Sequence, residues 1–179
     1  MHRFHLVILG LLSFALVSGR YPMSVGSLDA ASDARVARDE ANRISAIVRG
    51  VNPALSEPES ARIGRAVLNS SARFNLDPEL VTAVLLVESG GRPWARSPKG
   101  AVGLMQVMPH MTSGMQIAGN LTIIESNIEA GCAILAGNIR RLGEADGISA
   151  YFWGSEIRGV GYLDRVREAR AVVRRFSES

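Results

Sequence analysis

The sequence predicts a predominantly α-helical protein with a single packed domain. Apolar residues recur at the three- and four-residue spacing of helices in several segments, and no segment alternates apolar and polar residues over the length of a strand. Two segments also begin with the residue order that is typical of helix starts. The chain has 179 residues, of which 47% are hydrophobic, and this length and composition suit one core.

Composition also narrows the chemistry that the chain can perform. It contains one Cys and three His, and His2 and His5 lie at the extreme N-terminus. An internal disulfide and a metal site built on several Cys or His side chains are therefore excluded, and we expect no metal and no cofactor. The formal charge is +3, and the Arg residues are interleaved with acids rather than gathered in a dense basic run, so we expect no nucleic-acid partner. If the protein is an enzyme, carboxylates are its expected reactive groups.

Residues 1–19 have the order of a secretory signal peptide. A short segment that carries Arg3 precedes an apolar run over residues 6–17, and small residues suited to cleavage follow it. The run is shorter than the roughly 20 residues that cross a bilayer, although an uncleaved anchor also fits this segment. Cleavage would place the remaining chain in the periplasm or outside the cell, with no membrane span left in it.

The next segment is expected to connect the signal peptide to the domain. Residues 20–54 form this N-terminal part, and residues 29–49 within it are rich in Ala, Arg and Asp with only sparse apolar positions. This composition fits either a surface helix that docks weakly or a partly disordered spacer. We expect the packed domain to span residues 55–176 and residues 177–179 to form a short tail.

The first two helices of the domain are predicted from their starts. Ser56 precedes Pro58 and Glu59, which is the order of an N-cap, an early Pro and a capping Glu. Asp77 precedes Pro78 in a similar way. The second of these helices is apolar around much of its circumference, so we expect it to be buried and to end at the pair of glycines that follows it. The first should bury one face, made of Ile63, Ala66, Val67 and Ser70.

Two further helices follow an irregular segment. Residues 92–114 contain Gly, Pro and Ser at short intervals, so we expect a structured loop with short helical pieces. Apolar residues at helical spacing between Ile124 and Leu142 predict the next helix, which Gly143 should end. The last helix is expected over residues 161–176, with an apolar inner face and an Arg-rich outer face.

Glu88 differs from the other acidic residues. Many of those lie at helix starts, whereas Glu88 lies in the last turn of a helix that should be buried, above Val84 and Leu85. Burial and the negative end of the helix dipole both raise the pKa of a carboxyl group, and a carboxylic acid that stays neutral near neutral pH can act as a general acid. A Glu that reaches solvent past the following glycines fits this position equally well.

The residues after Glu88 favour the first interpretation. Three motifs follow one another along the chain: Glu-Ser at residues 88–89, Gly-Leu-Met-Gln-Val-Met-Pro at residues 103–109 and Asn-Ile-x-x-Gly at residues 127–131. In this order they resemble the catalytic region of the soluble lytic transglycosylases, which share the goose-type lysozyme fold. The resemblance covers about residues 55–176. It implies a predominantly α, lysozyme-like catalytic domain.

The resemblance implies cleavage of the β-1,4 bond between N-acetylmuramic acid (MurNAc) and N-acetylglucosamine (GlcNAc) in peptidoglycan. Glu88 would first protonate the leaving glycosidic oxygen. As a carboxylate, it would then accept the proton of the 6-hydroxyl of the muramic acid while that oxygen attacks. The product is a 1,6-anhydro sugar formed without water, and one carboxylate suffices because the substrate supplies the nucleophile.

The resemblance also assigns substrate-binding roles by position. Ser97 would donate a hydrogen bond to the substrate or to Glu88, although a turn serine fits as well. Met105 would form an apolar floor for a sugar ring or else pack in the core, and Gln106 would hydrogen-bond the N-acetyl group. Tyr151 would place its hydroxyl near the acid.

One motif departs from the family pattern. The family usually has Ala-Tyr-Asn followed shortly by Gly, whereas this chain has Ala-Tyr-Phe-Trp-Gly at residues 150–154. Phe152 therefore replaces the Asn, and we expect a more aromatic wall beside Tyr151. Trp94 and Trp153 fit either stacking on sugars or packing in the core.

Two other functions fit the same residues. A lysozyme-type muramidase would hydrolyse the same bond, and a peptidoglycan-binding scaffold would bind without turnover. Peptidoglycan glycan strands are the expected partner in all three cases. The small size also fits an enzyme that opens the wall locally for a cell-envelope apparatus. No clear signal for an oligomer is present, so we expect a monomer.

Overall fold

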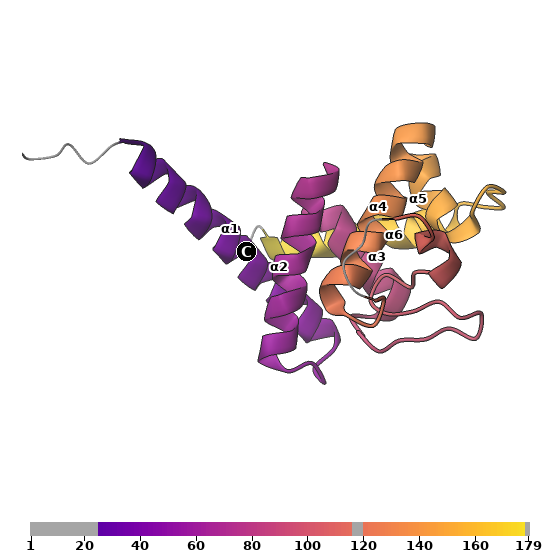
Figure 1. The fold of residues 1–179 in the computed structure, drawn as a ribbon, viewed down its shortest axis with the longest axis horizontal. Coiled ribbons are helices and arrows are strands. Elements are labelled where there is room, and N and C mark those ends of the chain that lie inside the picture. The colour runs from indigo at the N-terminus through magenta and orange to yellow at the C-terminus, as the bar shows by residue number, and fades with distance from the viewer. Residues whose placement is uncertain (1–24, 116–119, 178–179) are drawn as a thin grey trace, which may run out of the picture.

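The chain folds into helices joined by short segments and by one long loop, whose described residues are 90–115 and 120–123 (Figure 1). The computed structural model describes residues 25–115 and 120–177, so the signal peptide expected at residues 1–19 lies outside it. The helices are α1 (Val25–Val51), α2 (Glu57–Phe74), α3 (Pro78–Ser89), the short 3-10 helix η1 (Pro109–Thr112), α4 (Ile124–Leu142), α5 (Glu144–Trp153) and α6 (Gly161–Ser177). These described residues contain isolated β-bridges but no β-strand, which confirms the predominantly α class.

The predicted helix starts are present together with their caps. The Ser56 hydroxyl accepts a hydrogen bond from the Glu59 amide at 3.4 Å, and the Ser56 amide donates to the Glu59 carboxylate at 3.0 Å, which completes the capping box of α2. Asp77 caps α3 by accepting a hydrogen bond from the Glu79 amide at 2.8 Å. Local sequence therefore determines where α2 and α3 begin.

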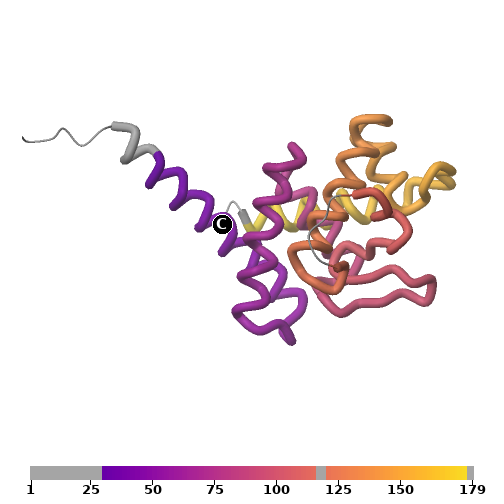
Figure 2. Tube along the Cα trace, viewed as in Figure 1, coloured from indigo at the N-terminus to yellow at the C-terminus, as the bar shows by residue number. Residues whose placement is uncertain are grey.

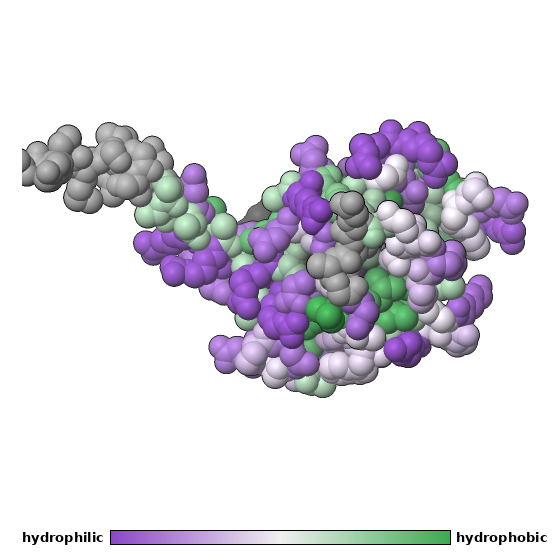
Figure 3. Space-filling view, viewed as in Figure 1, coloured by the Kyte–Doolittle hydropathy of each residue, from purple (hydrophilic) through white to green (hydrophobic). Residues whose placement is uncertain are grey.

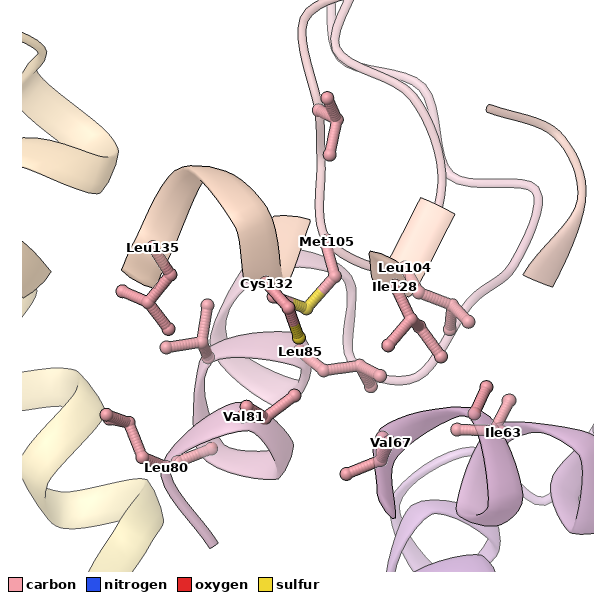
Figure 4. Packing of buried hydrophobic residues seen from close by; sticks show 14 of the residues in the cluster. Ile63, Val67, Leu80, Val81, Leu85, Leu104, Met105, Ile128, Cys132 and Leu135 are labelled. Atoms are coloured by element: carbon pink, nitrogen blue, oxygen red, sulfur yellow. The ribbon is translucent and has the colours of Figure 1, made fainter. Parts of the chain in front are cut away.

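α3 lies at the centre of the core. Its residues 80–85 are all buried, as the apolar circumference of this helix predicted. Figure 4 shows Val67 of α2 and Leu135 of α4 among the side chains that surround it. The predicted inner face of α2 is buried as well, and Leu104 and Met105 of the long loop belong to the same cluster.

α1 is packed more deeply than the sequence indicated. It is one continuous helix, and its second half contributes Ile44 and Val48 to the core, where they are 2% and 0% exposed. It crosses α2 closely at Gly64, where a Cβ would lie 2.1 Å from the carbonyl oxygen of Ala41. Residues 30–39, by contrast, are exposed and project from the body, and Figure 3 shows hydrophilic residues along this projecting half. The core therefore begins N-terminal to the domain boundary that we expected.

α5 is an element that the sequence did not predict. It follows α4 directly, with Gly143 as the boundary of both helices, and has only 10 residues. It packs tightly against α4, because a Cβ on Gly147 would lie 2.6 Å from the Cα of Ile139. The predicted helices on either side, α4 and α6, are present, and Val166 and Val173 of α6 are buried as expected.

α6 runs antiparallel to α3. Tyr162, near the start of α6, hydrogen-bonds Glu88 at the end of α3, whereas Arg170, two turns later, forms an ion pair with Asp77 at the start of α3. The loop that follows α3 reaches out from the body as a rose-coloured hairpin in Figure 2. None of the described helices is long and apolar enough to cross a membrane.

Candidate active site

Glu88 lies where α3 ends. Gly90 adopts φ 61°, the left-handed conformation that commonly ends a helix, so the chain turns away just after the acid. Val84 and Leu85, one turn earlier, are fully buried, and the Glu88 side chain is partly buried above them. Burial raises the pKa of the Glu88 carboxyl above its usual value, which is the direction predicted from the sequence.

Tyr162 of α6 is the hydrogen-bond partner of Glu88. Its hydroxyl donates to Oε1 of Glu88 at 2.6 Å, and its side chain is buried. Burial and the negative charge of Glu88 raise the pKa of Tyr162 far above its usual value. The phenol therefore stays protonated and acts as a permanent donor to one carboxylate oxygen.

The role of Tyr162 was not predicted, although the sequence contains a signal for its burial. Tyr162 precedes Val166 by four residues and so shares the apolar inner face of α6. That spacing does not predict which residue the Tyr162 hydroxyl contacts. Only the antiparallel packing of α6 on α3 brings the hydroxyl to Glu88.

The hydroxyl of Tyr151 bonds the long loop and not the acid. Its hydroxyl donates to the main-chain oxygen of Met105 at 2.8 Å instead of to Glu88. Burial first, and then the charge of Glu88, raise the pKa of Tyr151 well above its usual value. Tyr151 therefore fixes the long loop, and the phenol that hydrogen-bonds Glu88 is that of Tyr162.

Asn127 of α4 holds the long loop from its other side. Its Nδ2 atom donates to the carbonyl oxygens of Val102 at 2.8 Å and Leu121 at 2.9 Å, and its Oδ1 atom accepts from the Met105 amide at 2.8 Å. The approach is close: Gly103 adopts φ 77°, and a Cβ there would lie 2.4 Å from Nδ2 of Asn127. Asn127 is thus a structural residue.

The side chain of Met105 lies in the core, whereas that of Gln106 is bonded to the loop. Met105 is fully buried and packs against Gly131, where a Cβ would lie 2.5 Å from the Cβ of Met105, so its side chain is part of the core and not a sugar-binding floor. Gln106 adopts φ 46°, and its Nε2 atom donates to the carbonyl oxygens of Gly103 at 2.9 Å and Ala95 at 3.3 Å. Both bonds use the amide nitrogen, so the amide oxygen of Gln106 can accept a hydrogen bond from a ligand.

Ser97 lies in a tight turn of the same loop. Its Oγ atom accepts a hydrogen bond from the Ala101 amide at 3.0 Å, and its carbonyl oxygen accepts one from the Gly100 amide at 3.0 Å. In the part of the chain that the structure describes, no hydrogen bond joins Ser97 to Glu88. The turn-serine interpretation therefore describes this structure, and the Ser97 hydroxyl keeps its proton to donate.

An aromatic cluster flanks Tyr162 and includes Phe152, the residue from which an aromatic wall beside Tyr151 was expected. The ring of Phe152 stacks on that of Tyr162, with centroids 5.0 Å apart and planes 14° apart, and Trp153 meets Phe152 edge-on at 4.9 Å. The guanidinium of Arg165 lies 5.7 Å from the Tyr162 centroid and 5.9 Å from that of Phe152. Phe152 and Trp153 are 51% and 37% exposed, so this wall faces solvent.

Two cavities adjoin the long loop. One has a volume of about 540 Å³ and the other about 170 Å³, and both are lined by Arg96, Val102 and Thr122. Trp94 lines the smaller cavity and is 57% exposed, so it is not a core residue. Neither cavity is lined by Glu88 or Tyr162.

Comparison with known proteins connects this site to a family. Residues 65–158 match the family described as Transglycosylase SLT domain. A transglycosylase of Enterobacteria phage PRD1 is 39% identical over 87 residues, which cover 48% of this chain and 32% of the phage protein. An endo-type membrane-bound lytic murein transglycosylase A of Klebsiella pneumoniae is 38% identical over 78 residues, which cover 37% of this chain and 38% of that protein.

Among solved structures, an inactive mutant of the lytic transglycosylase Slt from Pseudomonas aeruginosa aligns with 62% of this chain and 22% of its own, at 22% identity and a TM-score of 0.43. The chain spans about a third of the length of the curated relatives it matches, 32% and 38%. The matched residues 65–158 include Glu88 and all the predicted substrate-binding residues, whereas Tyr162 and Arg165 follow them. Because this match covers more than half of the 179 residues, the chain belongs to the Transglycosylase SLT domain family.

Proposed function

We propose that this protein is a peptidoglycan lytic transglycosylase that cleaves the MurNAc–GlcNAc β-1,4 bond and leaves a 1,6-anhydro-MurNAc end. The observation that carries the proposal is Glu88, a partly buried acid with a raised pKa and one phenolic donor, within the SLT segment. The names of the phage and Klebsiella relatives support the same reaction. Among the described residues, the groups that shift the pKa of Glu88 include no second carboxylate, so a mechanism with one acid suits this site.

In the first step Glu88 acts as a general acid. Its raised pKa keeps a larger share of the carboxyl protonated near neutral pH, and this proton goes to the glycosidic oxygen. The bond between that oxygen and the anomeric carbon breaks, and its electron pair leaves with the oxygen. The N-acetyl group of the substrate stabilises the positive charge that develops on the anomeric carbon.

In the second step the Glu88 carboxylate acts as a general base. It accepts the proton of the muramic acid 6-hydroxyl while that oxygen bonds to the anomeric carbon, which closes the anhydro ring and restores the acid. The hydrogen bond from Tyr162 lowers the pKa of Glu88 against the effect of burial and so stabilises the carboxylate between the two steps. The nucleophile is part of the same molecule, and its high effective concentration favours it over water.

We assign the remaining residues two kinds of role. Gln106 and Ser97 would contact the substrate, since the amide oxygen of Gln106 and the hydroxyl proton of Ser97 are available for hydrogen bonds. Met105 and Tyr151 would act indirectly, because their mutual hydrogen bond holds the loop that carries Gln106. Substitution of Gln106 or Ser97 should therefore lower the affinity for substrate, whereas substitution of Met105 or Tyr151 should lower the order of the loop.

We also propose that the protein works in the periplasm or outside the cell, where peptidoglycan lies. The order of residues 1–19 supports this location, and N-terminal sequencing of the exported protein would test cleavage after residue 19. A monomer that acts alone, or one recruited by a cell-envelope apparatus, would carry out the same reaction.

Product analysis is the test of the proposed reaction. Purified peptidoglycan is digested and the fragments are analysed by mass spectrometry. Anhydro-MurNAc ends are the expected outcome. Reducing MurNAc ends would identify a muramidase, and binding without any fragments would identify a scaffold.

Substitution of the acid tests the assignment of the site. Glu88→Gln should reduce the rate by about 100-fold or more, since general acid and base catalysis contribute this much, and should keep the fold. Glu125→Gln is a matched control, because Glu125 is an acid of α4 that pairs with Arg62 and not with the site. A Glu88→Gln variant that cleaves as fast as the control would overturn the assignment.

A further inference from the structure

Three side chains form a stacked unit beside the proposed acid. Phe152 covers the ring of Tyr162 at 5.0 Å and 14°, and the guanidinium of Arg165 lies within 6 Å of both ring centroids, at 5.9 and 5.7 Å. These distances are within the range in which stacked rings and cation–π pairs attract each other. Tyr162, at the centre of this unit, donates its hydrogen bond to Glu88 at 2.6 Å.

We propose that Phe152 and Arg165 are positioning residues for the Tyr162–Glu88 pair, and that they set the pH range in which Glu88 works as an acid. This inference rests on the proposed function for its consequence in catalysis. The geometry that it describes can be tested without turnover.

Stacking fixes the direction of the phenolic hydroxyl. The hydroxyl oxygen lies on the Cβ–Cγ axis of Tyr162, so a flip of the ring leaves it in place, whereas a swing of the side chain about the Cα–Cβ bond moves the donor away from the carboxylate. A ring that stacks at 14° on one face of Tyr162 restricts this swing. Phe152 stands where the resembling family usually has Asn, whose amide group has no ring to stack on Tyr162.

Arg165 contributes through its charge as well as its position. The groups that act on Glu88 from the helices around it are Tyr162 and Arg165 of α6 and Tyr151 of α5, and the guanidinium is the charged one among them. Burial raises the pKa of Glu88, whereas the Tyr162 hydrogen bond and the Arg165 charge lower it. The ion pairs of the described residues do not include Arg165, so no neighbouring acid neutralises its charge.

Two pairs of variants separate the effect of the charge of Arg165 from the effect of the ring of Phe152. Arg165→Met removes the charge and Arg165→Lys restores it, while Phe152→Leu removes the flat ring and Phe152→Tyr restores it. Both positions are exposed, so the fold should tolerate all four changes. Arg167→Met is the control, because Arg167 is also an exposed Arg of α6 but lies next to Asp164, at 3.9 Å, and not next to the aromatic rings.

The first measurement is the pKa of Glu88 from ¹³C carboxyl NMR, with the signal assigned by its loss in Glu88→Gln. The pKa should rise above the wild-type value in Arg165→Met and in Phe152→Leu, because each change weakens an interaction that favours the carboxylate. Arg165→Lys and Phe152→Tyr should return it toward the wild-type value, and Arg167→Met should leave it unchanged. An unchanged pKa in both Arg165→Met and Phe152→Leu would overturn the proposal, whether or not the protein cleaves peptidoglycan.

The second measurement separates positioning from substrate contact. In Arg165→Met the alkaline limb of the pH profile of kcat/KM should move to higher pH, because the acid stays protonated further up the scale. In Phe152→Leu kcat should fall by about 10-fold with KM within about 2-fold of wild type, as expected for a misplaced catalytic group. A raised KM with unchanged kcat would mean that Phe152 contacts the sugar, and it would overturn the positioning role. If wild type forms no anhydro product, the proposed function fails and the NMR result still decides this inference.

Discussion

At the scale of single residues, Glu88 places stability and function in conflict. Burial raises its pKa, so in the folded protein it holds its proton at pH values where the unfolded chain has released it. Folding stability therefore falls as pH rises from the usual pKa of a Glu, 4.5, through the higher pKa of the folded state. At neutral pH the charge of Glu88 opposes folding, and its retention is explained by the acid chemistry that we propose.

Glu88→Gln should consequently stabilise the protein at pH 7, by about 1 kcal/mol, since an amide removes the buried charge and still accepts the Tyr162 hydrogen bond. The gain should vanish well below pH 4.5, where the carboxyl is protonated in both states. Thermal unfolding at pH 7 and at acid pH measures both effects. Equal unfolding temperatures of the two proteins at pH 7 would contradict this account of Glu88.

Asn127 provides a second prediction at this scale. Asn127→Ala leaves the carbonyl oxygens of Val102 and Leu121 and the amide of Met105 without their partner. Unsatisfied polar groups of this kind cost about 1–3 kcal/mol each, so we expect urea unfolding to report a loss of about 3 kcal/mol. Asn138→Ala, farther along the same helix, should change stability by less than about 0.5 kcal/mol because its side chain bonds only an exposed Arg.

The sequence predicted site residues where a local pattern determines them. The raised pKa of Glu88 followed from its place in the last turn of a helix expected to be buried. The role of Tyr162 and the hydrogen-bond partner of Tyr151 were not predicted, because each phenol bonds a residue distant in sequence, 74 residues away for Tyr162 and 46 for Tyr151. The identity of such partners depends on how the helices pack against one another, and a local sequence pattern does not determine this packing.

At the scale of elements, glycines set the distances between neighbouring segments. A Cβ would lie 2.1 Å from α1 at Gly64, 2.5 Å from the long loop at Gly131 and 2.6 Å from α4 at Gly147. Real Cβ atoms do not approach other atoms so closely, so each glycine permits a contact that any other residue would push apart. The sequence motif that contains Gly131 is thus explained by the Met105 side chain that packs on it.

A matched pair on α4 tests this interpretation. Gly131→Ala should lower the free energy of unfolding by about 2 kcal/mol, as overpacking against Met105 forces the loop outward. Gly137→Ala should instead raise it by about 0.5 kcal/mol or more, because its Cβ meets only Arg140 Nη2 at 3.9 Å and Ala is the better helix former. Urea unfolding of both variants measures the difference. Equal losses in the two variants would mean that helix propensity, and not packing, decides the effect.

The same scale shows which elements a sequence can predict. α2 and α3 were predicted closely because Ser56 and Asp77 cap them through local hydrogen bonds. α5 was missed because it is short and follows α4 without a loop, and because its packing rests on contacts with α4 and α6. The missed helix matters for the site, because α5 carries both Tyr151 and Phe152.

At the scale of the whole molecule, α6 ties the two ends of α3 together. Arg170 pairs with Asp77 at the start of α3 and with Glu144 at the start of α5, while Tyr162 bonds Glu88 at the end of α3. The acid is therefore placed by the arrangement of three helices and not by its own helix alone. Helical content was predictable from periodicity, whereas the lysozyme-like arrangement was expected only through the family resemblance, which family membership supports.

The position of α1 gives the prediction that belongs to this scale. A variant that begins at residue 40 should unfold at nearly the same urea concentration as the full chain, because residues 30–39 are exposed. A variant that begins at residue 55 also loses Ile44, Ile47 and Val48, which are 2%, 9% and 0% exposed. Burial of each such side chain contributes about 1.5–3 kcal/mol, so the summed loss is comparable to the whole stability of a domain, about 5–15 kcal/mol.

The shorter variant should therefore be largely unfolded without denaturant, with the inner faces of α2 and α3 open to proteolysis. Circular dichroism and limited trypsin digestion of the two truncations measure this directly. If the variant that begins at residue 55 unfolds cooperatively at the same urea concentration as the one that begins at residue 40, α1 is a separate attachment and the boundary expected from the sequence is the real one. If it does not, Ile44 and Val48 make α1 part of the same cooperative unit that positions Glu88, because α1 packs on both α2 and α3.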